Sequence, residues 1–190
     1  MANTDIRFGL RYVSGPIQLV RFNLTASYGV ALFLGDCIAT VTAGTVERHT
    51  PGSGISGVIW GFIRSDDMPV SNITASDTTY TYKIIANVSP ETLYWCQEDG
   101  DTTPLALTDI GNNVNLIYTH AGSTTTGISG MEIDSSSKAT TATLDVSLLR
   151  LANEYIEPDG TVTAFDSTSG LAKFLVKVKN FIHASGVSGI

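Results

Sequence analysis

The stretch Thr141-Ala142-Thr143-Leu144-Asp145-Val146-Ser147-Leu148 decides the fold class of this 190-residue chain. Apolar and polar side chains alternate along it without a break, so that the apolar set faces one way and the polar set, Asp145 included, faces the other. Alternation with a period of two is typical of a β-strand with one buried face. The sequence therefore predicts a strand over residues 141–148.

The same alternation recurs in several shorter segments on both sides of this stretch. Further strands are expected at 6–12, 19–24, 37–42, 58–63, 80–84, 93–97 and 173–179. Asp99-Gly100 has the residue types of a tight hairpin turn, and the Thr, Ser and Gly of 122–130 predict an exposed loop. No long segment repeats apolar residues at helical spacing. We expect an all-β fold, an antiparallel β-barrel or β-sandwich with exposed loops.

The chain length suits one domain with short appendages. A globule of this size buries roughly 70% of the surface that its unfolded chain exposes, which is enough for a core. We expect an extended N-terminal arm at 1–16, a single β domain at 17–182 and a C-terminal tail at 183–190. The alternative for the arm is a first strand that packs in its own domain.

The charge balance argues against several classes of partner. The net charge is −7 and the pI is near 4.7, so binding of nucleic acid through phosphate neutralisation is not expected. No apolar run approaches the length of a membrane span, and no secretory signal precedes residue 17, so synthesis in a cytoplasm is expected. Cys37 and Cys96 lack metal-ligand spacing and fit small buried side chains.

The chain contains partial matches to catalytic motifs, but none has the spacing or structural context that the motif requires. Residues 52–57 match the spacing of a dinucleotide-binding loop, but they lead into a predicted strand and not into a helix. Residues 127–130 close one position short of a nucleophile elbow. Asp66 and Asp67 are adjacent, which places them on opposite faces of a strand. The three histidines are scattered. The sequence predicts no catalytic, cofactor or metal site, and thus no enzyme.

Blocks spread along the chain resemble the head proteins that tailed phages encode beside their major capsid protein. They are the opening residues 1–5 with 8–11, Gly35-Asp36, the block at 57–61, the block at 130–135 and the ending at 183–190. Each block is common by itself, and their order and spacing carry the resemblance. The chain departs from that pattern at 64–67, where a short connection stands in place of a longer insertion rich in proline and aromatic residues.

The resemblance implies a capsid decoration, or cement, protein, which binds the outer surface of an assembled icosahedral capsid and stabilises it. Its partners would be the major capsid protein and further copies of itself, with a trimer favoured and a dimer as the alternative. Candidate contact residues lie on the arm and the tail. They are Ile6, Phe8, Leu10, Tyr12, Val187 and Ile190.

Other function classes remain open on the sequence. One is a different structural role in the virion head, and another is a remote glycan hydrolase. The last is a carbohydrate-binding β-sandwich module, which would display a row of exposed aromatic side chains. The candidates for such a row are Trp60, Tyr80, Tyr82, Tyr94 and Trp95.

Overall fold

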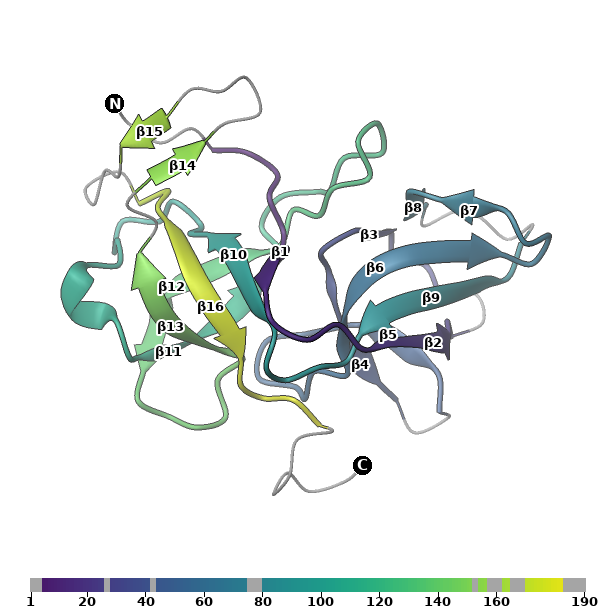
Figure 1. Cartoon of the computed structure of the whole chain (residues 1–190), viewed down its shortest axis with the longest axis horizontal. Helices are drawn as coiled ribbons and strands as arrows, with labels where there is room; N and C mark the ends of the chain where they lie inside the picture. Colours follow the sequence, from purple (N-terminus) through teal and green to yellow (C-terminus); the bar gives the residue numbers. More distant parts are fainter. Residues whose placement is uncertain are drawn as a thin grey trace.

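The fold was analysed in a computed structural model, which describes residues 5–25, 28–41, 44–74, 80–151, 154–156, 162–164 and 170–182. Nearly all regular structure in these residues is antiparallel β-sheet, and the sheets pack as a sandwich (Figure 1). The prediction of an all-β fold is confirmed, and the sandwich is one of the two architectures expected. In this part of the chain, no helix has the length and apolar character that crossing a bilayer requires.

The first large sheet has the strand order β1-β10-β16-β13-β11-β12. Its strands are β1 (Arg11–Ser14), β10 (Leu93–Gln97), β11 (Asn113–Ile117), β12 (Glu132–Ala139), β13 (Val146–Leu151) and β16 (Lys173–Val178). The 3-10 helix η1 (Leu107–Asp109) lies between β10 and β11 in the chain. Because β1 is the first strand of this order, it pairs with β10 on one side only and leaves its other edge free of the sheet.

The second large sheet has the order β2-β9-β6-β4-β5, with β7 also paired to β6. Its strands are β2 (Leu19–Asn23), β4 (Cys37–Thr40), β5 (Val46–Arg48), β6 (Gly57–Arg64), β7 (Pro69–Val70) and β9 (Tyr82–Asn87). Two small sheets complete the fold, β3 (Leu32–Phe33) with β8 (Asn72–Ile73) and β14 (Glu154–Ile156) with β15 (Val162–Ala164). The edge strands of this sheet are β2 and β5, and Leu24, directly after β2, forms a bridge with Val46 of β5.

Two hydrophobic clusters form the core. The larger cluster combines side chains of the first sheet, such as Phe174, with Cys37 and Val58 of the second. The smaller lies between the second sheet and the β3–β8 pair. Half-buried Phe22 packs against both clusters, so the two parts of the core adjoin. Cys37 and Cys96 are buried free thiols, as expected.

The strand that decided the fold class starts later than predicted. β13 begins at Val146, and residues 142–145 form a turn and bend. Val146 and Leu148 are buried as expected, but Asp145 is also fully buried, so its predicted position on the solvent face is wrong. The reason is that Asp145 accepts backbone and side-chain contacts from neighbouring segments, which no periodic pattern encodes.

The expected hairpin at Asp99-Gly100 is also not formed. Gly100 has a positive φ of 72°, as such a turn requires, but residues 99–101 form neither a turn nor a bend. Moreover, β10 pairs with β1 and β16, and not with the strand that follows it in the chain. Buried Glu98 accepts hydrogen bonds from the backbone N–H groups of Leu105 (2.5 Å) and Ala172 (3.4 Å), which fastens this segment to other parts of the sheet.

Candidate functional site

The segment that joins the two sheets along their edges is the most exposed apolar feature of the described chain. β1 and β2 follow each other in sequence, and the chain passes from the edge of one sheet to the edge of the other between them (Figure 1). Ten consecutive residues, 12–21, are exposed. Five of them carry large apolar side chains that are 36–49% exposed, namely Tyr12, Val13, Ile17, Leu19 and Val20.

Residues 12–21, which we call the edge segment, are held in place by hydrogen bonds despite their exposure. Thr92 Oγ1 donates to Pro16 O at 2.6 Å, Val88 N donates to Gln18 O at 2.9 Å, and Gln18 N donates to Asn87 Oδ1 at 2.9 Å. Because its position is fixed in the free chain, a partner that binds here does not have to order it.

A hollow opens beside the start of the edge segment, between the two sheets. Its lining is mainly apolar and includes Leu10, Tyr12, Leu34 and Trp60. Trp60 is 37% exposed, and its ring meets that of Tyr12 edge to face with the centroids 5.4 Å apart. Tyr12 belongs to both the hollow and the edge segment.

The predicted contact residues fall into three groups. Phe8 and Leu10 are buried in the core of this chain, with exposed fractions of 1% and 4%. Tyr12 is exposed in the edge segment and Ile6 is half-buried. Val187 and Ile190 lie outside the described residues. The structure therefore brings Tyr12 together with residues that the sequence had not singled out, Ile17 and Leu19.

Of the aromatic residues considered for a carbohydrate platform, only Trp60 is clearly exposed. Tyr94 and Tyr82 are buried at 1% and 9%, and Tyr80 and Trp95 are half-buried. These side chains therefore do not form the exposed row that the sequence left open.

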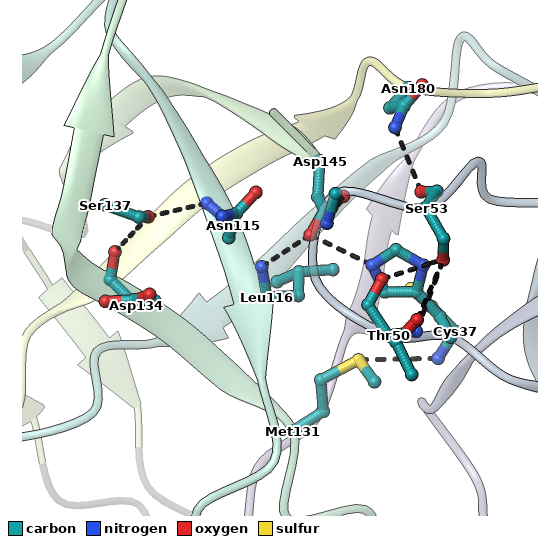
Figure 2. A network of polar contacts seen from close by, with 12 residues as sticks. Cys37, Thr50, Ser53, Asn115, Leu116, Met131, Asp134, Ser137, Asp145 and Asn180 are labelled. Atoms are coloured by element: carbon teal, nitrogen blue, oxygen red, sulfur yellow. Dashed lines mark hydrogen bonds and ion pairs between the residues drawn. The ribbon is translucent and has the colours of Figure 1, made fainter. Parts of the chain in front are cut away.

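A second arrangement joins Ser53, His49 and Asp145 across the two sheets. Ser53 Oγ lies 2.9 Å from His49 Nδ1, and His49 Nε2 lies 2.9 Å from Asp145 Oδ2. Nε2 meets no other partner among the described residues, so the contact with Asp145 is what compensates its burial. Asp145 also accepts from the backbone N–H of Leu116 at 2.9 Å (Figure 2).

The residue types are those of a hydrolase triad, but the contacts are those of a structural clamp. Ser53 Oγ donates to Thr50 O at 2.7 Å and accepts from Thr50 N at 3.3 Å, which closes a turn in the chain (Figure 2). His49 is only 4% exposed, so a substrate has no direct access to it. Because Asp145 directly precedes β13 of the first sheet and His49 directly follows β5 of the second, the arrangement holds the two sheets together.

A third cluster gathers Asp5, His120 and Glu132. His120 Nε2 lies 3.2 Å from Asp5 Oδ2, and Nδ1 lies 3.1 Å from Glu132 Oε2. A hydrogen bond from the His120 ring to the Glu132 carboxylate raises the pKa of the imidazole, and burial raises the pKa of Glu132. The sequence analysis missed this cluster because Asp5 is 115 positions from His120, and no motif spacing connects them.

Buried carboxylates form the last set of unusual side chains. Asp36 is fully buried between β3 and β4. Burial raises its pKa to about 7, although the hydrogen bonds from Ser129 and Phe33 act to lower it. Glu98 also has its pKa raised to about 7 by burial. Neither residue lines the apolar hollow beside the edge segment, so their chemistry belongs to the stability of the fold.

Comparisons of the chain with protein families, with curated proteins and with solved structures found no match.

Proposed function

We propose that this chain is a structural protein of a tailed-phage virion, which binds the outside of the assembled icosahedral capsid and stabilises it. The observation that carries the proposal is the edge segment. It presents five exposed apolar side chains on two adjacent sheet edges that have no partner strand in their sheets. The sequence blocks that resemble phage head proteins favour a capsid lattice as the partner.

Free sheet edges are suited to protein docking. An edge strand offers unpaired backbone N–H and C=O groups, and another chain can add a strand there while pockets select its side chains. Soluble proteins normally protect such edges with charges, prolines or bulges. The edge segment contains one charge, Arg21, one proline, Pro16, and a register shift between Tyr12 and Ser14, so β2 is the part of it that suits strand addition best.

The size of this surface favours binding through several copies. Full burial of one large apolar side chain is worth about 1.5–3 kcal/mol. The side chains of the edge segment are already more than half covered, so docking of all five and Trp60 would contribute roughly 5 kcal/mol before the cost of association. One copy would bind weakly. A symmetric trimer or dimer on a repeating lattice multiplies such contacts through effective concentration.

The acidic charge favours the outer face of the shell. With a net charge of −7, the chain is repelled by the packaged DNA on the inner wall. In intact virions, a membrane-impermeant amine reagent should modify exposed lysines such as Lys83 and Lys179. Labelling of this chain only after particles are disrupted would contradict the outer location.

Co-sedimentation with empty assembled capsids of the phage that encodes the chain tests the docking surface. The native chain should pellet with capsids and saturate at a fixed number of copies per capsid. Leu19→Asp places a charge on the edge segment at a side chain that is 49% exposed, so the variant should fold but bind at least tenfold more weakly. Raised thermal stability of decorated capsids is the second measurement.

Leu107→Asp is the matched control, because Leu107 is 65% exposed on η1, outside both sheets. It should sediment with capsids like the native chain. Native protein that stays in the supernatant would refute capsid binding. Equal binding by Leu19→Asp and native protein would leave capsid binding intact and refute the edge segment as its surface.

Carbohydrate binding is the second candidate function. One observation favours it: Trp60 and Tyr12 stand together at the mouth of an apolar hollow, and aromatic faces with polar tips suit sugar rings. Binding to a glycan array that is lost in Trp60→Ala would support it, while an array without signal would reject it.

A further inference from the structure

We propose that Asp5, His120 and Glu132 form a binding site for a divalent first-row transition-metal cation of the zinc type. The proposal is independent of the capsid-binding function. Each side chain offers one ligand atom, and the three atoms lie within 4.8 Å of one another. One imidazole nitrogen and two carboxylate oxygens form a donor set that zinc uses in proteins, with water completing the coordination.

The spacing of the atoms fits such an ion. Ligands at about 2.1 Å from a tetrahedral zinc lie about 3.4 Å from each other. The contact of His120 Nε2 with Asp5 Oδ2 is 3.2 Å, and that of His120 Nδ1 with Glu132 Oε2 is 3.1 Å. One ion binds only one of the two ring nitrogens, so the carboxylate beside the other nitrogen must shift toward the ion, and the three ligand atoms already lie within 4.8 Å of one another.

Glu132 supplies an independent sign of a missing ligand. The residue is 1% exposed. Its Oε2 accepts a hydrogen bond from Thr119 Oγ1 and faces His120. Its buried Oε1 has no hydrogen-bond partner among the described residues. A buried carboxylate oxygen without a partner costs free energy. A cation coordinated by Oε1 would remove that cost.

Charge and surroundings also suit a divalent cation. Two carboxylates with a neutral imidazole carry two negative charges, which one divalent ion balances. A hollow lined by Asp5, His120, Ser123 and Thr126 adjoins the cluster and leaves room for water ligands.

Among the described residues, Arg7 places a positive charge beside the cluster. Arg7 also lines the hollow, and its Nε donates to Ala121 O at 2.7 Å. This bond and the proposed site would both fasten residues 5–7 to the segment that leads into β12. Binding of the ion should therefore protect the chain near Arg7.

Titration of the full chain with zinc after treatment with a chelator, followed by calorimetry, tests the site. The native protein should bind one zinc per chain, and calcium and magnesium should not compete, because they prefer all-oxygen sites. Asp5→Asn alters a side chain that is 44% exposed, so it should fold normally and bind zinc about tenfold or more weakly. His120→Gln should abolish stoichiometric binding.

Asp67→Asn and His183→Gln are the matched controls for the loss of a carboxylate and of a histidine, and both should bind zinc like the native chain. Cleavage by trypsin after Arg7 is a second readout, and zinc should slow it in the native chain but not in His120→Gln. The absence of saturable zinc binding, or equal zinc affinity of the native chain, Asp5→Asn and His120→Gln, would overturn the proposal.

Discussion

At the scale of single residues, the fold places ionisable groups where water cannot reach them. Asp36 accepts hydrogen bonds from Ser129 Oγ and from Phe33 N at 2.9 Å, yet burial dominates and raises its pKa to about 7. The protonated side chain is thus the form that the fold favours. Its stabilising effect is complete below about pH 4, the pKa range of an unfolded aspartate, and is lost as the pH rises through about 7.

Asp36→Asn should therefore remove part of the pH dependence of stability. In the native chain the free energy of unfolding should fall between pH 4 and pH 7, with Asp36 contributing about 4 kcal/mol to the fall. Urea unfolding at several pH values measures this. The exposed variant Asp67→Asn should keep the native pH profile. An unchanged profile in Asp36→Asn would show that Asp36 titrates normally.

Asp145 has the opposite role, because three neighbours rely on its carboxylate. It receives the backbone N–H groups of Leu116 and, at 3.3 Å, of Gly52, and it meets the ring of His49. Asp145→Ala would leave these groups buried without a partner and should lower the free energy of unfolding by about 3–5 kcal/mol. Glu91→Ala, which removes an exposed ion pair with Lys177, should cost about 1 kcal/mol or less. Similar losses in chemical denaturation of the two variants would contradict the clamp.

At the scale of elements, the sequence predicted several strands from their apolar alternation but missed β11, where Val114 and Leu116 alternate with asparagines. β10 matches the expected 93–97, and β6 and β16 differ from expectation by one residue at their ends. β12 was missed because its residues after Ile133 are mostly polar. It is the last strand in the order of its sheet and forms its ladder with β11, with one further bridge from Ile133 to Glu98.

The sequence also did not predict that β2 is exposed. Alternation at 19–24 predicted a half-buried strand, but Leu19 and Val20 of β2 are both exposed. A periodic pattern reports that a strand forms, whereas its position at the edge of a sheet is set by pairing between distant segments. The same holds for the Asp5, His120 and Glu132 cluster, which exists only once the first residues meet the segment before β12.

Gly15 governs how β1 leads into β2. Its φ is 107°, and a Cβ there would lie 2.7 Å from the backbone oxygen of Glu91. Gly15→Ala should therefore lower the free energy of unfolding by about 1–3 kcal/mol and weaken capsid binding by displacing the edge segment. Gly29→Ala is the matched control, since its Cβ would meet no atom within 4 Å. Thermal melts that do not distinguish the two variants would count against this role of Gly15.

At the scale of the whole molecule, three kinds of contact join the two large sheets. Their hydrophobic clusters meet at Phe22, the contact of His49 with Asp145 crosses between them, and the edge segment runs along both. Two sheets that shared no more than a linker would unfold separately. A body that is to reinforce a capsid benefits from the opposite property, because load on one sheet is then carried by the other.

The chain carries one natural fluorescent reporter in each sheet, which makes this coupling measurable. Trp95 lies in β10 of the first sheet and Trp60 in β6 of the second. In Trp60→Phe the fluorescence follows only the first sheet, and in Trp95→Phe only the second. Within each variant, fluorescence and circular dichroism should give the same unfolding midpoint in urea, because one cooperative transition moves all probes together. A fluorescence midpoint that departs from the circular dichroism midpoint in either variant would mean that the sheets unfold independently, and that the contacts across their joint are too weak to transmit load.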